Sequence, residues 1–172
     1  MMNRYYFGFS LIELMATLFI STALTLTALP SLLAIKHQYR SLMAAHSILQ
    51  FIQFSRNHAL SYGRNVTVCP LSNNQCDNNW QAGMSAFFDS GTRNKLDGDD
   101  QLISILPAFN SQDIAYYNRK AIRFQIDGFA SGTNGTFRYC PQSTSNRYSR
   151  AVIVNQAGRI RFSTNQNITC TK

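Results

Sequence analysis

Two arginines separated by one residue, near the end of the chain, are the side chains best suited to chemistry. They lie in the segment Gly158-Arg159-Ile160-Arg161-Phe162. If this segment is a β-strand, Arg159 and Arg161 point to one face, and the apolar Ile160 and Phe162 point to the other. The arginine stems are then about 6.6 Å apart, and phosphates of one DNA strand recur about every 3.4 Å. Because a guanidinium can donate two parallel hydrogen bonds to phosphate oxygens, the pair is suited to hold nearby phosphates of one backbone.

The same pattern also fits an ordinary amphipathic edge strand, in which arginines provide solubility and prevent edge pairing. The distribution of charge favours an anionic partner. The chain carries a net charge of +8, and residues 36–118 contain six basic and six acidic residues. Residues 119–172 contain nine basic residues and a single acid, Asp127. Nearly all excess charge therefore belongs to the last third of the chain, which indicates a polyanion such as nucleic acid or an anionic surface.

Other residues of this last third extend the candidate DNA-binding set. Arg147 and Arg150 flank a polar loop beside the same hairpin, and Lys172 ends the chain. Four tyrosines lie among the bases, where they can either stack on single-stranded bases or complete the edge of a β-core. These are Tyr116, Tyr117, Tyr139 and Tyr148. With no base-reading helix in the pattern, we expect binding mainly to phosphate, with weak sequence preference and a steep dependence on salt.

No pattern in the sequence predicts an enzyme, a metal site or a cofactor. Asp97-Gly98-Asp99-Asp100 resembles a calcium loop in composition, but it lacks EF-hand spacing and a closing Glu, so a solvated turn is favoured. The cysteines have no CxxC spacing, and all histidines lie in the segment expected to be helical. P-loop and dinucleotide glycine patterns are absent as well.

The four cysteines allow three disulfide pairings. We favour Cys69–Cys76, which closes a short polar loop, and Cys140–Cys170, which ties down the C-terminal tail. Free buried thiols are the alternative. Disulfides require an oxidising compartment such as the periplasm.

The N-terminal region predicts a membrane anchor. Gly8-Phe9-Ser10-Leu11-Ile12-Glu13 opens an apolar run, and no charge occurs from Leu14 to Ile35. About 22 residues are enough to cross a bilayer as a helix. The carboxylate of Glu13 near the entrance costs a few kcal/mol unless it is paired. Cleavage between Gly8 and Phe9 would create an α-amino group four residues away, which is a natural partner.

Two alternatives exist for this segment. Ser10 and Glu13 fit a helix capping box, and a basic start followed by an apolar core also fits a signal peptide. The apolar run is longer than a usual signal core, and it continues into an amphipathic helix, which favours a retained anchor.

The remaining patterns predict one long helix followed by an antiparallel β-domain. We expect a leader over residues 1–8, a transmembrane helix half over 9–35, an amphipathic half over 36–62 and a periplasmic β-domain over 63–172 with a basic C-terminal hairpin. The apolar stripe of the amphipathic half consists of Leu42, Ala45, Ile48, Leu49, Ile52 and Ala59. After Gly63, which is expected to end the helix, period-two patterns predict strands around residues 66–68, 80–88, 102–106, 122–126, 137–139, 152–154 and 160–162. The fold class is therefore α+β, with the helix stripe packed on the sheet.

The N-terminal motif resembles that of type IV pilins and type II secretion pseudopilins. In that family a prepilin peptidase cuts after the glycine and methylates the new N-terminal residue, so the resemblance implies these roles for Gly8 and Phe9, and a role in assembly for Glu13. The order of elements and the segment from Phe87 to Ile103 resemble the FimT/GspH branch of the family. This likeness implies a helix packed on two small antiparallel sheets, anchored in the bacterial inner membrane by one pass, with other pilin subunits as partners.

Gly158-Arg159-Ile160-Arg161 also matches the Gly-Arg-x-Arg motif of DNA-binding minor pilins of the FimT kind. That resemblance implies DNA contact by Arg159 and Arg161 and a function in DNA uptake during natural transformation. Two other hypotheses remain. A structural or priming subunit of a secretion fibre or pilus tip would bury the basic face against acidic partners. An adhesin would instead bind anionic glycans.

Overall fold

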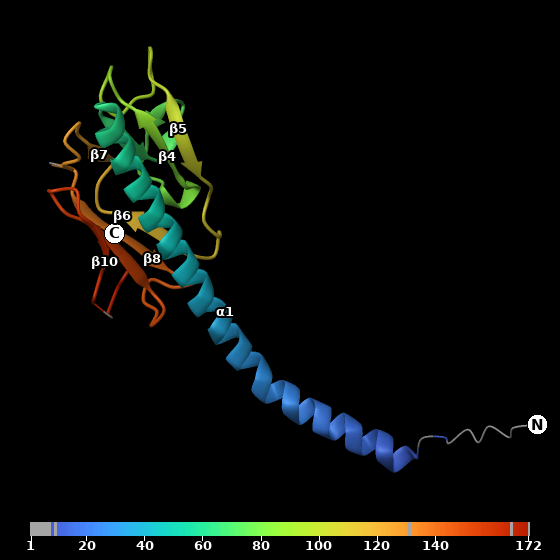
Figure 1. Cartoon of the computed structure of the whole chain (residues 1–172). Helices are drawn as coiled ribbons and strands as arrows, with labels where there is room; N and C mark the ends of the chain where they lie inside the picture. Colours follow the sequence, from blue (N-terminus) through green and yellow to red (C-terminus); the bar gives the residue numbers. More distant parts are fainter. Residues whose placement is uncertain (1–7, 9, 131, 166, 172) are drawn as a thin grey trace, which may run out of the picture. The chain divides into compact units, whose positions relative to one another are not determined.

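The structure is a computed structural model that describes residue 8 and residues 10–130, 132–165 and 167–171. Contacts divide the chain into two compact units, Met1–His37 and Gln38–Lys172. Helix α1 spans Leu11–Tyr62 and so contributes to both units (Figure 1). Phe9 and Lys172, two residues of the predicted functional set, lie outside the described residues.

In the first unit, the apolar side chains of α1 are exposed. The helix is long and apolar enough to cross a bilayer. Its hydroxyls bond to backbone carbonyls one turn earlier, as Thr17 does to Leu14 at 2.9 Å and Thr22 to Phe19 at 2.9 Å. Such bonds satisfy polar groups that would otherwise be costly in an apolar medium. The carbonyl of Ser10 accepts the backbone N–H of Glu13 at 3.1 Å. Between these two described residues, the side-chain bonds of a capping box are not formed.

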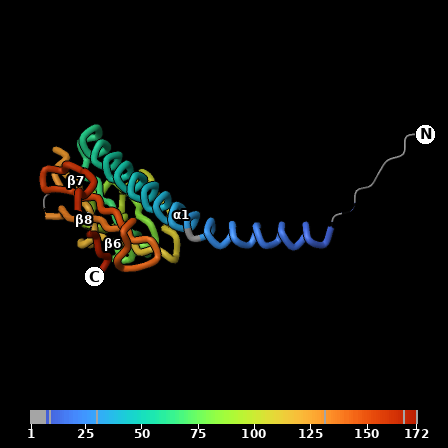
Figure 2. Tube along the Cα trace, turned by 90° about the horizontal axis from the view of Figure 1, so that it is seen from below, coloured from blue at the N-terminus to red at the C-terminus, as the bar shows by residue number. Residues whose placement is uncertain are grey.

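In the second unit, α1 lies along the strands (Figure 2). It buries one stripe of its side chains. The buried residues of this stripe are Ser41, Ala45, Ile48, Phe51, Ile52, Ser55 and Ala59. They recur at spacings of three and four, as one face of a helix requires. Leu42, expected in the stripe, is 39% exposed, and its neighbour Ser41 is buried instead with its hydroxyl donating to the carbonyl of Tyr148. The helix ends at Gly63, whose φ of 57° is the left-handed conformation expected there.

Two four-stranded antiparallel sheets pack with this helix around one core. The first sheet has the order β5-β4-β1-β7, and the second has the order β10-β9-β8-β6. The first sheet contains β1 (Val66–Cys69), β4 (Met84–Phe88), β5 (Leu102–Leu106) and β7 (Ile122–Phe124). The second contains β6 (Ile114–Tyr117), β8 (Gly135–Cys140), β9 (Arg150–Val154) and β10 (Ile160–Phe162). The α+β fold with a helix on two antiparallel sheets is thus confirmed.

Three local predictions were incomplete. Trp80–Ala82 forms a 3-10 turn (η1), and the strand expected from residue 80 begins only at Met84. Gly83 lies between η1 and β4. Only glycine fits at this position, because a Cβ there would lie 2.3 Å from the carbonyl oxygen of Leu106. The short hairpin of β2 (Leu71–Ser72) and β3 (Gln75–Cys76), and strand β6, were not predicted.

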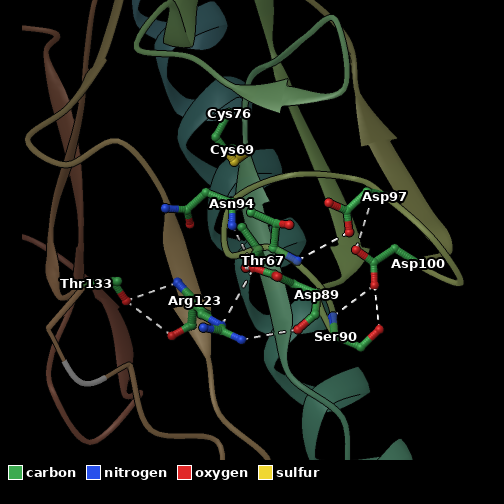
Figure 3. A network of polar contacts seen from close by, with 11 residues as sticks. Thr67, Cys69, Cys76, Asp89, Ser90, Asn94, Asp97, Asp100, Arg123 and Thr133 are labelled. Carbon is green, nitrogen blue, oxygen red and sulfur yellow. Dashed lines mark hydrogen bonds and ion pairs between the residues drawn. A yellow bond between two sulfur atoms is a disulfide. The ribbon is translucent and has the colours of Figure 1, made fainter.

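Strand β1 is buried on both faces, although its alternation predicted one solvated face. The hydroxyl of Thr67 donates to the carboxylate of Asp89, which also accepts the backbone N–H of Asn94 at 3.1 Å (Figure 3). The guanidinium of Arg123 lies 3.7 Å from the same carboxylate. The β4–β5 loop therefore covers Thr67, and its buried charge is compensated by Arg123.

Both disulfides have the connectivity favoured from the sequence, Cys69–Cys76 and Cys140–Cys170. The second one fixes the tail over the outer face of the second sheet, where Ile168 packs with Ala151 and Cys140 in a small separate cluster. A buried ion pair joins α1 to this sheet, with Arg40 donating to Asp113 at 2.6 Å.

Candidate nucleic-acid interface

The turn between β9 and β10 presents the arginine pair. The backbone N–H of Gly158 donates to the carbonyl of Asn155 at 3.0 Å, and Asn155 donates in turn to the carbonyl of Arg159 at 3.0 Å. The side-chain oxygen of Asn155 also accepts the N–H of Arg159 at 2.8 Å. Asn155 therefore binds both the N–H and the carbonyl of Arg159. These two hydrogen bonds fix the position of the Arg159 Cα, from which the arginine side chain extends.

Gly158 is required by a close approach of two turns. Its φ is 74°, and a Cβ there would lie 1.9 Å from the carbonyl oxygen of Gly128 and 2.7 Å from Nε of Arg56. Gly128 closes the neighbouring turn with the same positive φ of 74°. A side chain at residue 158 would thus be strained by its backbone and would also clash with fixed backbone atoms.

The alternation expected for the arginine strand is present. Ile160 and Phe162 pack against the core, and the ring of Phe162 meets the ring of His46 edge-on at a centroid distance of 4.9 Å. Arg159 and Arg161 are exposed. Within the described part of the chain, neither guanidinium pairs with a carboxylate, and Arg161 donates only to the nearby carbonyl of Phe162 at 3.4 Å. Arg161 therefore lies on a strand whose other face packs on the core, and Arg159 lies directly before that strand.

The other predicted cations do not all join this pair. Arg150 is paired with the buried Tyr139 in the β8–β9 register, so it points to the opposite, core-facing side of the sheet. Arg147 is exposed in the β8–β9 loop, and its guanidinium lies 4.7 Å from the ring centre of Tyr148. Arg138 shares the outer face with Arg161, but it is half-buried where the C-terminal tail crosses. Arg123 is held by Asp89 and belongs to the first sheet.

Two of the four candidate stacking tyrosines are unsuited to that role. Tyr117 and Tyr139 are buried in the core, and burial raises the pKa of each phenol. Tyr139 donates its hydroxyl to Asp113, and that contact raises its pKa further. Tyr116 is half-buried, and Tyr148 is covered by Arg147. The candidate interface is therefore cationic rather than aromatic, and such a surface is better suited to phosphate contact than to base stacking.

One cation beside the motif was not identified from the sequence. Arg56 of α1 donates its Nε to the carbonyl of Gly128 at 3.0 Å. The same Nε lies 2.7 Å from the position of a Cβ on Gly158, so Arg56 also lies against the turn that precedes Arg159. Arg56 is far from Arg159 along the chain. In the sequence it has the pattern of an ordinary solvent-exposed residue on the polar face of the helix. Only the packing of two distant turns brings it to the interface.

The acidic loop forms a network of internal hydrogen bonds. Asp100 accepts the N–H and the hydroxyl of Ser90 at 2.9 and 2.6 Å. Among the described residues, no group of three or more His, Cys, Asp or Glu side chains is arranged to hold a metal ion.

Residues 44–158 match the family model described as Type II transport protein GspH. The chain belongs to the GspH family. This GspH-family chain is also similar in fold to crystal structures of the type IV minor pilin FimU of Pseudomonas aeruginosa, strain PAO1. One, in space group P21, gives a TM-score of 0.61 at 19% identity, covering 76% of this chain and 95% of FimU. A second crystal form, P65, gives 0.59 at 19% identity, with 76% and 99% covered.

A comparison with curated protein sequences finds no match. At 19% identity the likeness to FimU shows the fold. The family places this chain among pilin-like and pseudopilin-like proteins, which associate with other subunits and anchor in a membrane through an N-terminal apolar helix. The family match ends at Gly158, so Arg159 and Arg161 lie immediately beyond it.

Proposed function

We propose that this chain is a minor type IV pilin that binds DNA through Arg159 and Arg161 and serves DNA uptake in natural transformation. The observation that carries the proposal is the exposed arginine pair at the start of β10, with Arg159 directly before the strand and Arg161 within it. The pair belongs to the strongly basic last third of the chain and pairs with no described carboxylate. Anchoring of Ile160 and Phe162 in the core reduces the entropy that the arginines lose when they bind phosphate.

Processing and assembly form part of the same proposal. Cleavage after Gly8 by a prepilin peptidase would free the amine of Phe9, which is then methylated. Glu13 lies in the first turn of α1, where its carboxylate would pair with such an amine of a neighbouring subunit. The protein would occupy the bacterial inner membrane by a single pass before it enters a pilus, with its β-domain in the periplasm.

The test is an electrophoretic mobility shift with random-sequence duplex DNA and the full-length chain in a non-ionic detergent. Replacing Arg159→Gln together with Arg161→Gln should weaken binding at least about tenfold, because hydrogen bonds to charged groups contribute about 1.5–3 kcal/mol each. The matched control is Arg93→Gln with Lys120→Gln, which removes the same charge from exposed positions in other loops. Equal binding by the two double variants would contradict the site, and no binding by the wild type at low salt would contradict the function.

The cellular counterpart is a transformation assay in a strain carrying only the two arginine substitutions, with pilus formation measured in parallel. We expect transformation to fall while pili persist. Loss of pili would instead indicate a structural role for this face.

The family match favours a second candidate function, that of a structural pseudopilin in a type II secretion fibre or a priming subunit at a pilus tip. In that case the basic face would contact acidic partner subunits, and the arginine variants would impair secretion or assembly without a change in DNA affinity.

An anionic glycan is the remaining alternative ligand. It would be indicated if the protein bound heparin and if deletion of its gene left transformation unchanged.

A further inference from the structure

A polar hollow lies between α1 and the start of β10, directly beside the arginine pair. Its volume is about 370 Å³. It is lined by Gln53, Arg56, Asn57, Gly158, Arg159 and Ile160. All of these residues belong to the second compact unit, so helix and hairpin are placed by one common core.

Arg56 lines this hollow, and a backbone contact fixes its orientation. Its Nε donates to the carbonyl of Gly128, and the same Nε lies 2.7 Å from the position that a Cβ of Gly158 would occupy. Among the described residues, Arg56 makes no further hydrogen bond or ion pair. One edge of its guanidinium is therefore bound to backbone, and its terminal amino groups stay available to a ligand.

The chemistry of the lining favours an anion. Arg56 and Arg159 supply two positive charges, and the exposed carboxamides of Gln53 and Asn57 can donate hydrogen bonds. No acidic side chain belongs to the described lining. At about 370 Å³, the hollow is large enough to admit a phosphate group.

We propose that this hollow binds a phosphate of the DNA backbone, with Arg56 as a third DNA-binding arginine and with Gln53 and Asn57 as supporting donors. This inference rests on the proposed function and extends it, since contact then runs from Arg161 through Arg159 onto the C-terminal turns of α1. The bound strand crosses from the β-hairpin to the helix. Gly158 contributes to the site because its lack of a side chain allows Arg56 and Arg159 to line the same hollow.

The experiment measures DNA affinity and its salt dependence for the full-length protein in non-ionic detergent, with random-sequence duplex as the probe. Arg56→Gln should weaken binding about fivefold or more and reduce the slope of log K against log salt by about 1, as expected for one lost phosphate contact. A purely structural role for Arg56 would leave that slope unchanged.

A second pair of variants tests the hollow without removing the hydrogen bond between Arg56 and Gly128. Asn57→Asp places a negative charge in the hollow and should weaken binding, whereas Asn57→Arg should strengthen it, each by about threefold to tenfold in proportion to one charge. The matched controls are Asn78→Asp and Asn78→Arg, because Asn78 is an exposed asparagine outside the hollow. Thermal unfolding of all variants shows which of them remain folded.

The outcomes separate this inference from the function on which it rests. If the Asn57 variants bind DNA like the Asn78 variants while the Arg159 and Arg161 variant loses binding, the hollow is not a phosphate site and the proposed function stands. If the wild type does not bind DNA, both are overturned. If Arg56→Gln fails to fold, the opposite responses of the two Asn57 variants still decide the question.

Discussion

At the residue scale, the position of the Arg56 side chain requires a glycine at residue 158, because a Cβ there would lie 2.7 Å from Nε of Arg56. The turn at residues 155–158 packs on the turn that ends at Gly128, and the backbone N–H of Ala130 donates to the carbonyl of Gln156 at 3.0 Å. Arg56 closes this contact from the helix. The glycine of the arginine motif therefore has a packing role, and it determines where the arginines stand without touching a ligand itself.

We predict that Gly158→Ala destabilises the protein strongly. The positive φ alone costs about 1–2 kcal/mol for a residue with a Cβ, and the clash with the Gly128 carbonyl adds to it. Urea unfolding measures the change. Gly132→Ala is the matched control, since Gly132 has nearly the same φ of 75° but nothing within 4 Å of an added Cβ. Similar losses in both variants would show that the approach of the two turns is unimportant.

The buried carboxylate of Asp113 is a second residue with a large expected effect. It accepts hydrogen bonds from Arg40, from Tyr139 and from the N–H of Gln142 at 3.2 Å. Asp113→Ala should cost about 3 kcal/mol of unfolding free energy, because it removes a buried carboxylate that accepts three hydrogen bonds. Lys95→Ala, which breaks the exposed pair with Asp97 at 3.6 Å, should cost at most about 1 kcal/mol. Equal costs in the two variants would exclude a special role for the buried pair.

At the scale of elements, the two disulfides restrain different parts of the β-domain. Cys69–Cys76 spans 7 residues around the β2–β3 hairpin, whereas Cys140–Cys170 spans 30 residues and holds the tail on the second sheet. In the loop-entropy description, stabilisation grows with the length of the closed loop. The longer loop should therefore contribute more.

We expect the double variant Cys140→Ser with Cys170→Ser to lose about 1 kcal/mol more unfolding free energy than Cys69→Ser with Cys76→Ser. Denaturant titration of the two variants in parallel measures this difference. Equal or reversed losses would mean that contacts of the tail, such as Ile168 on Ala151, persist without the disulfide.

The acidic β4–β5 loop is expected to make stability depend on pH. Burial raises the pKa of Asp100, but the hydrogen bonds from Ser90 outweigh this and hold the pKa below its ordinary value. Hydrogen bonds from Thr92 lower the pKa of Asp97 as well. Since these carboxyls bind protons less readily in the folded state, they stabilise the fold above about pH 4, and this stabilisation is lost as pH falls through the folded pKa.

Asp100→Asn should accordingly lower the melting temperature at pH 7 by a few degrees, and its difference from wild type should shrink as pH falls below about 4. Asp99→Asn is the control, because the neighbouring Asp99 carboxylate accepts no hydrogen bond from the described residues. A constant difference between pH 7 and pH 2 would show that the loop contributes through shape and not through charge.

At the scale of the whole molecule, the number of arginines that contact phosphate governs how DNA binding responds to salt. Three phosphate contacts, at Arg56, Arg159 and Arg161, give a slope of at least about −2.7 for log K against log salt. A fourfold rise in salt should then weaken binding about 40-fold. Filter binding with several duplex sequences measures both this slope and the sequence preference. A flat salt response, or strong preference for one sequence, would contradict phosphate recognition.

Much of this architecture follows from local sequence patterns. The apolar run, the three- and four-residue spacing of Ala45, Ile48 and Ile52, and Gly63 determine a helix of the observed length, because helix periodicity and its end are local properties. The alternation around Phe137, Val152 and Ile160 likewise identifies three of the four strands of the second sheet, all except β6. The observed disulfides are the two that the sequence favoured, Cys69–Cys76 because it closes a short polar loop and Cys140–Cys170 because it ties down the C-terminal tail.

Tertiary structure alone decided how distant segments meet. Thr67 is buried because a loop more than twenty residues later covers it, and Arg150 points away from Arg161 because the register pairs it with Tyr139. Arg56 joins Arg159 because two glycine turns touch. Alternation along one strand determines which residues share a face. Which elements that face contacts depends on how the sheets, loops and helix pack.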